Sequence, residues 1–194
     1  GIRKDHVARY QFVANRLAKG SRVVDFACGI GYGTRTMAVA GAIAHGFDID
    51  AEAIGSAKPH YIWHNTEFAV ADGASPGELE KYDAAVCFET IEHIEDPRPL
   101  LKALHAAAPL LYCSVPNEDV MPFEPEPGIT TAYHLRHYTK YEFAAVLREC
   151  GWLVNEWHGQ EGSESDVEAN LRGRTLIAVC ERGEIEEEGP KGKH

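Results

Sequence analysis

Short apolar runs alternate with segments of helical periodicity along most of the chain. The apolar runs predict seven strands, at residues 22–26, 43–47, 67–70, 84–88, 110–115, 152–157 and 175–180. Helical spacing predicts helices at residues 6–17, 51–57, 97–107 and 140–150, and another between the first strand and about residue 40. This alternation is typical of an α/β fold with a mostly parallel sheet and helices on both faces. Because a non-helical loop joins the last two strands, we expect the sheet to end in an antiparallel hairpin.

Two segments depart from this pattern. Residues 116–131 are rich in proline and lack periodicity, which predicts a loop. A loop of that length is more often a lid or binding element than a plain connector. Residues 183–194 are charged and contain glycine and proline, so we expect a disordered acidic tail after a single domain of residues 1–182.

Composition excludes several classes of protein. The formal net charge is -11, which argues against a nucleic-acid partner, because such partners are bound through lysine and arginine. The five cysteines form no CxxC pair, which favours free thiols in a reducing compartment. Apolar runs are too short for a membrane span and no signal peptide opens the sequence, so we expect a cytoplasmic protein. The oligomeric state stays open.

A glycine-rich turn follows the first predicted strand in the segment VVDFACGIGYG. Ligands of open α/β sheets bind at the carboxyl ends of the strands, where glycines let the backbone pass close to the ligand. The dinucleotide fingerprint would need glycine at position 34, which is Thr34. The turn therefore suits a ligand with a carboxylate and no pyrophosphate, although an ordinary strand-to-helix turn is the alternative.

Acidic residues follow the next two predicted strands. Asp48 ends the segment GFD at a position suited to binding both ribose hydroxyls of a nucleoside, whereas Asp50 suits a helix cap. Asp72 could accept from an adenine amino group, or form an Asx turn before Gly73. The three strand ends together predict a nucleoside with a carboxylated arm, which is S-adenosylmethionine (SAM).

The segments RYQFVANRLAKGSRVVDFACGIGYGTRTMA, GFDID, VADG, YDAAVCFETIEHIEDP and CSVPN resemble class I SAM-dependent methyltransferases in order and spacing. The likeness covers roughly residues 9–179 and is greatest to a bacterial and phage group often found beside glycosyltransferases. It implies a Rossmann-like seven-stranded fold, SAM as methyl donor, and an acceptor bound above the carboxyl edge of the sheet. The sequence departs from the pattern at AAAPLL, where the family has Pro-Gly-Gly, in a turn remote from the chemistry.

The resemblance also implies which residues bind SAM. They lie in the first helix, the glycine turn and the ends of the next strands: Tyr10, Ala27, Gly29, Gly31, Asp48, Ile49, Asp72, Phe88 and Glu89. In the family, residues matching Ala27 and the glycines line the methionine part, and those matching Phe88 and Glu89 border the sulfonium. Tyr10 is expected to close over the site.

The residues left for acceptor chemistry are acids and histidines in ETIEH and YHLRH. If the fourth strand passes into a helix, Glu89, Glu92 and His93 share one face, and His134 or His137 could fold over it. Helix-dipole stabilisation of the acids and structural roles for the histidines are the alternatives.

Similar E-x-x-E-H segments occur in ubiquinone-biosynthesis O-methyltransferases and small-RNA 2′-O-methyltransferases, where they are associated with a divalent metal. The resemblance thus raises the hypothesis of a metal held by Glu89, Glu92, His93 and one of the loop histidines, His134 or, as the alternative, His137. In the metal-free alternative, His93, His134 or His137 is catalytic, with one of the two loop histidines acting as general base.

These observations predict a methyltransferase that acts on an oxygen of a small-molecule acceptor, with a sugar or glycoconjugate suggested by the family context. An RNA 2′-O-methyltransferase and a SAM-binding protein without transferase activity are the alternatives. A basic surface would favour the former, and the net charge does not predict one.

Overall fold

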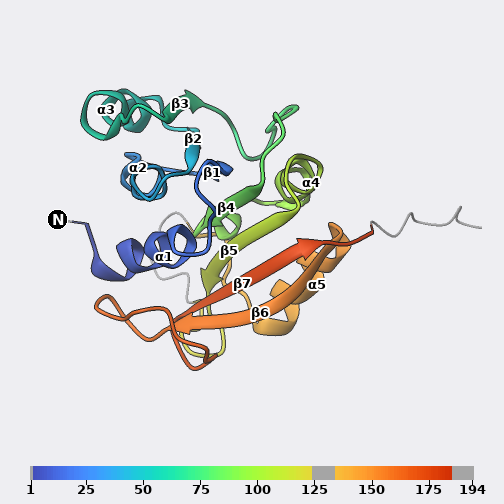
Figure 1. The fold of residues 1–194 in the computed structure, drawn as a ribbon. Coiled ribbons are helices and arrows are strands. Elements are labelled where there is room, and N and C mark those ends of the chain that lie inside the picture. Colours follow the sequence, from blue (N-terminus) through green and yellow to red (C-terminus); the bar gives the residue numbers. More distant parts are fainter. Residues whose placement is uncertain (1, 124–133, 185–194) are drawn as a thin grey trace, which may run out of the picture.

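The computed structural model describes residues 2–123 and 134–184, and its centre is a seven-stranded sheet (Figure 1). The strands lie in the order β3-β2-β1-β4-β5-β7-β6. Their bounds are β1 Arg22–Phe26, β2 Ile43–Asp48, β3 Thr66–Val70, β4 Ala84–Phe88, β5 Leu110–Pro116, β6 Trp152–Gln160 and β7 Thr175–Arg182. The first five strands are parallel, whereas β7 runs antiparallel to both β5 and β6. The predicted fold class and terminal hairpin are confirmed.

Helices cover both faces of the sheet. They are α1 Lys4–Ala14, α2 Tyr32–Val39, α3 Ala51–Tyr61, α4 Arg98–Ala107 and α5 Lys140–Glu149, with a short 3₁₀ helix η1 at Ile91–His93. Figure 1 shows α1, α2 and α3 on one side and α4 and α5 on the other. All five residues of β4 are buried, as a central strand covered on both faces requires.

The local sequence accounts for where the helices begin. The side chain of Asp50 accepts a hydrogen bond from the backbone N–H of Glu52 at the start of α3. Thr139 and Glu142 form a reciprocal capping box at the start of α5. Gly31, in the left-handed region at φ 88°, stands before α2.

Two large hydrophobic clusters and a smaller one beside α3 fill the space between sheet and helices. On the side of α4 and α5, Leu100, Leu104 and Phe143 pack against the sheet. On the side of α1 and α2, Val13 and Met37 do so. All five cysteines are buried and free, as the predicted reduced thiols require.

The main departure from the predicted elements concerns residues 89–94. The expected continuation of the fourth strand into a helix is wrong: the backbone enters the left-handed region at Glu89 (φ 47°), and only η1 follows. Residues 116–131 also differ at their start, since Pro116 ends β5 and Asn117 forms a bridge with Tyr138. Residues 124–131 of that loop, and residues 185–194 of the predicted tail, lie outside the described residues. Among the helices of the described part, none is both long enough and apolar enough to cross a membrane.

Strand order reverses next to β1, which pairs with β2 on one side and with β4 on the other. Connections from the carboxyl ends of these strands leave in opposite directions, which opens a crevice at that edge. The glycine turn and the acidic strand ends all lie at this edge.

Candidate functional site

A cleft of about 430 Å³ opens at the carboxyl ends of β1 to β4. Residues at the ends of these strands, or just after them, line it: Ala27, Asp48, Ile49, Ala71, Asp72, Gly73, Glu89 and Thr90. His93 and Leu135 line its other side. Six of the predicted site residues therefore share one cavity, namely Ala27, Asp48, Ile49, Asp72, Glu89 and His93.

The glycine turn has a conformation that needs glycine at one position and leaves open space at another. A Cβ on Gly31 would lie 2.6 Å from Cε1 of Phe68, in a backbone conformation that is already left-handed. Gly29 is also left-handed (φ 54°), but a Cβ there would meet no heavy atom within 4 Å. Gly31 thus allows the turn to pack on β3, and Gly29 offers backbone that a ligand can approach.

The carboxylate of Asp48 connects the ends of β1 and β2. It accepts from the backbone N–H of Gly29 at 2.7 Å and from that of Asp50 at 2.9 Å. Asp50 uses its own side chain to cap α3 and is absent from the cleft lining. Asp48 is therefore the acid at this strand end that faces the cleft.

Asp72 forms the Asx turn that the sequence allowed and also lies at the cleft. Its Oδ1 accepts from the backbone N–H of Ala74 at 2.9 Å, which is the expected Asx turn. Asp72 also lines the cleft, and two lone pairs on each carboxylate oxygen leave acceptor capacity for a ligand.

Tyr10 does not close over the cleft. The side chain is buried in the core on the side of α1 and α2, where its hydroxyl donates to Oδ1 of Asp25 at 3.1 Å. Its ring packs edge-on against Phe88 at a centroid distance of 5.3 Å, and a Cβ on Gly33 would collide with it. Tyr10 and Phe88 therefore pack together in the core and do not line the cleft.

Asp25 is a buried acid that sequence reasoning did not identify. It accepts from Tyr10 and, at 2.6 Å, from the hydroxyl of Thr34 on α2. Burial raises its pKa to about 7, although these two hydrogen bonds act in the opposite direction. The available signal was an aspartate inside the apolar run VVDF.

Glu89 is separated from the other acid of its segment. Its Oε1 accepts from the hydroxyl of Ser114 at 2.9 Å and lies 3.8 Å from Nη1 of Arg9. The expected helical face shared by Glu89 and Glu92 does not form, because the chain turns at Glu89 instead of continuing as a helix. Glu89 consequently lies outside the cluster that contains Glu92.

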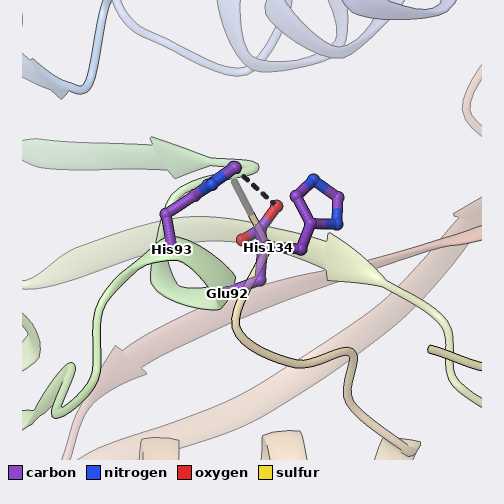
Figure 2. A group of neighbouring side chains, drawn as sticks. All are labelled: Glu92, His93 and His134. Carbon is purple, nitrogen blue, oxygen red and sulfur yellow. Dashed lines mark ion pairs between the residues drawn. The ribbon is translucent and has the colours of Figure 1, made fainter. Parts of the chain in front are cut away.

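Glu92, His93 and His134 form a compact group whose ligand atoms all lie within 4.8 Å of one another (Figure 2). Nε2 of His93 lies 3.8 Å from Oε1 of Glu92, and the rings of His93 and His134 meet edge to face at 4.6 Å. The backbone N–H of Leu135 donates to the carbonyl of Glu92 at 2.8 Å, which holds His134 beside η1.

The environment of Glu92 fits a bound cation. The side chain is fully buried, and neither carboxylate oxygen has a hydrogen-bond partner among the described residues. Burial, with the charge of Glu89, raises its pKa well above the usual range. A buried carboxylate without donors is costly unless something compensates for it, and two imidazoles beside it complete a donor set for a divalent metal.

His137 stands behind this group. Its Nε2 lies 2.9 Å from Nδ1 of His134, and its Nδ1 lies 2.7 Å from the carbonyl oxygen of Met121. The structure thus divides the two loop histidines: His134 joins Glu92 and His93, whereas His137 contacts His134.

Arg9 is the second buried charge that sequence reasoning missed. Its guanidinium donates to Gln160 at 3.0 Å and to Thr175 at 3.4 Å, and lies near Glu89. These partners come from the far end of the chain, so local pattern carried no signal for them.

The strand order and the cleft at the carboxyl ends of the parallel strands define an α/β protein of the Rossmann-like class. A family model described as a methyltransferase domain matches residues 3–164. The chain belongs to this family of methyltransferase domains, which confirms the resemblance found in the sequence. The narrower likeness to a glycosyltransferase-associated group stays a prediction.

Similar proteins include two ubiquinone biosynthesis O-methyltransferases. That of Paraburkholderia phymatum is 35% identical over 88 residues, which are 43% of this chain and 38% of the relative. That of Aeromonas salmonicida is 32% identical over 89 residues, which are 44% of this chain and 37% of the relative. The match thus spans less than two fifths of the length of these relatives.

Solved structures share the whole fold at low identity. A SAM-dependent methyltransferase from Mesorhizobium loti superposes with a TM-score of 0.72 at 18% identity, over 90% of this chain and 98% of that one. Magnesium protoporphyrin IX methyltransferase from Synechocystis, solved with bound S-adenosylhomocysteine, gives 0.69 at 20% identity, over 92% and 84%.

Proposed function

We propose that the chain is an enzyme that transfers the methyl group of SAM to an oxygen of a small molecule. One observation carries the proposal: the cleft at the strand ends adjoins a buried carboxylate that has two histidines beside it and no hydrogen-bond partner among the described residues. Membership of the methyltransferase-domain family supports the reaction class. Similarity to ubiquinone biosynthesis O-methyltransferases supports oxygen as the methylated atom.

The cleft has the groups that SAM requires. Asp48 retains lone pairs for the ribose hydroxyls after accepting from two backbone N–H groups. Ile49 is largely exposed at the cleft wall and offers an apolar surface for adenine, with Asp72 near its amino group. Ala27, the open backbone of Gly29 and the turn at Gly31 would lie along the methionine part.

The remaining residues account for acceptor chemistry. When bound, SAM supplies a methyl group activated by its sulfonium; the acceptor oxygen displaces the sulfur in line, and the sulfur keeps the electron pair. The protein's main contribution is to hold the acceptor in that line. A hydroxyl is a weak nucleophile at neutral pH, so a group that accepts its proton or lowers its pKa accelerates the transfer.

Glu92, His93 and His134 would hold a divalent metal that lowers the pKa of a coordinated hydroxyl. One carboxylate with two imidazoles favours Mn, Fe, Co or Zn over Mg, which prefers oxygen ligands. In the metal-free alternative, His134 takes the hydroxyl proton directly. Glu89, included in the sequence-based metal site, has Ser114 and Arg9 as partners and is not proposed as a ligand.

The proposal is tested by incubating the protein with SAM carrying a labelled methyl group and a panel of phenolic and sugar acceptors. We expect binding of SAM by calorimetry and label on an acceptor oxygen. A folded protein that does not bind SAM would overturn the proposal. Assays after exhaustive chelation separate the two mechanisms: persistent turnover with no metal in the protein favours His134 as general base, and loss restored by Mn²⁺ favours the metal.

A further inference from the structure

We infer that His137 is a positioning residue that fixes the tautomer of His134, so that Nε2 of His134 presents a lone pair beside Glu92 and His93. The inference starts from a chain of two hydrogen bonds through three groups: Met121, His137 and His134. The catalytic consequence rests on the proposed function, but the tautomer follows from the hydrogen bonds together with the burial of His137.

One end of this hydrogen-bond series has a fixed role, because a carbonyl oxygen is always an acceptor. The carbonyl oxygen of Met121 can only accept, so Nδ1 of His137 carries the proton and donates to it at 2.7 Å. A neutral imidazole has a single N–H, so Nε2 of His137 is an acceptor. Nδ1 of His134, at 2.9 Å from that nitrogen, must then be the donor. With its one proton on Nδ1, neutral His134 has an unprotonated Nε2.

The alternative is a charged His137 that donates from both nitrogens and places the proton of His134 on Nε2. The surroundings oppose it. His137 is buried, and among the described residues the one carboxylate oxygen within 4 Å of it, Oε2 of Glu118, lies 3.9 Å from its Nδ1, beyond hydrogen-bond distance. That oxygen already accepts from the backbone N–H of Phe123 at 2.8 Å. A buried imidazolium would thus lack a hydrogen-bonded counter-charge within the described part of the chain.

The orientation of the His134 ring decides which of its nitrogens faces Glu92 and His93. Because Nδ1 of His134 is occupied by His137, Nε2 is the nitrogen left for the group with Glu92 and His93 (Figure 2). A metal ligand and a general base both need an unprotonated nitrogen there. Backbone hydrogen bonds hold the segment on either side, from Leu135 to Glu92 and from Tyr138 to Pro116. His137 therefore serves either mechanism without touching the acceptor.

The direct test is the long-range ¹H–¹⁵N spectrum of protein labelled with ¹⁵N-histidine, with His134 assigned through a His134→Asn variant. We expect wild-type His134 to be protonated at Nδ1 alone. His137→Phe keeps the ring shape but cannot accept, so His134 should become a mixture of tautomers. His137→Gln can accept through its side-chain oxygen and should retain the wild-type tautomer. Protonation of wild-type His134 at Nε2 would overturn the inference, whether or not methyl transfer is found.

A second readout links the tautomer to the site. By calorimetry, we expect the affinity for Mn²⁺ to fall about tenfold or more in His137→Phe, as is usual when a partner of a metal ligand is removed. His137→Gln should recover most of it, and His105→Phe, at a buried histidine outside the cleft, should leave it unchanged. If Mn²⁺ does not bind, the rate of methyl transfer replaces Mn²⁺ affinity as the readout. That rate should fall in His137→Phe, recover in His137→Gln and stay unchanged in His105→Phe. Equal values in wild type and in a folded His137→Phe protein would refute the positioning role. If the wild-type protein does not bind SAM, the proposed function is refuted instead. The ¹H–¹⁵N spectrum still decides the tautomer of His134 in that case.

Discussion

Asp48 and Gly29 are joined by a 2.7 Å hydrogen bond from the backbone N–H of Gly29 to the carboxylate of Asp48. The bond ties the glycine turn after β1 to the end of β2, the two features on which the proposed SAM site depends. Asp48 thereby has a fixed orientation before any ligand binds. A pre-oriented carboxylate loses little conformational freedom when it accepts from ribose hydroxyls.

Replacing Asp48 by alanine should lower the affinity for SAM at least tenfold. The reason is the loss of hydrogen bonds to a charged acceptor, each worth about 1.5–3 kcal/mol. Calorimetry with SAM measures the change. Asp50→Ala is the matched control, since it removes a helix cap worth about 1 kcal/mol but no group that lines the cleft. Wild-type affinity in a folded Asp48→Ala protein would contradict the assignment.

Replacing Glu92 by leucine should stabilise the metal-free protein and abolish its stabilisation by Mn²⁺. The buried carboxyl has no hydrogen-bond partner among the described residues, and removing such a group recovers about 1–3 kcal/mol. Thermal unfolding in chelator and in MnCl₂ tests both effects, because a ligand that binds only the folded state raises the melting temperature.

Glu156→Gln provides the control for this experiment. Glu156 also pairs with a histidine, His158, at 2.8 Å, but neither residue lines the cleft. The Glu156 variant should keep the Mn²⁺ effect. A Glu92→Leu protein that melts lower in chelator and still responds to Mn²⁺ would exclude Glu92 as a ligand.

Asp25 should make stability fall as the pH rises from about 4 to about 7. Its folded pKa of about 7 lies above the usual value of 3.8, so in this window the folded state holds a proton that the unfolded state has released. Within this window, Asp25 should lower the free energy of unfolding by up to about 1.4 kcal/mol per pH unit. Denaturant titrations across this range should show a shallower pH dependence in Asp25→Asn. Identical profiles for the two proteins would show that Asp25 titrates normally.

Single-stranded RNA should bind weakly and should not be methylated. The formal net charge of -11 opposes the phosphate backbone and weakens non-specific binding. Fluorescence anisotropy with a labelled oligonucleotide at several salt concentrations measures this. Salt-sensitive binding below micromolar concentration, followed by methyl incorporation, would favour an RNA substrate instead.

The sequence predicted the sheet and one side of the site because both depend on local pattern. Most strands contain an apolar run, and Asp48 and Asp72 come at or just after the ends of two neighbouring strands, so parallel topology brings them to one edge. The acceptor side depends on backbone conformation and on distant contacts. A left-handed Glu89 redirects the chain and separates its carboxylate from Glu92, and helical spacing could not anticipate that.

Burial was likewise invisible in the local pattern. Asp25 lies in an apolar run without any sign of its partners Tyr10 and Thr34. The pairing of His134 with His137 depends on the carbonyl of Met121, which is a tertiary contact. The separate roles of the two histidines therefore emerged only from the structure.

The contacts of Arg9 have a consequence for how the protein is made. Its guanidinium lies in α1, near the beginning of the chain, while its hydrogen-bond partners Gln160 and Thr175 belong to the final hairpin. A nascent chain leaves the ribosome from its amino end. The hydrogen bonds of Arg9 to Gln160 and Thr175 therefore form only after β6 and β7 have been synthesised. The sheet can assemble in stages, but its last strands complete the burial of one of its first residues.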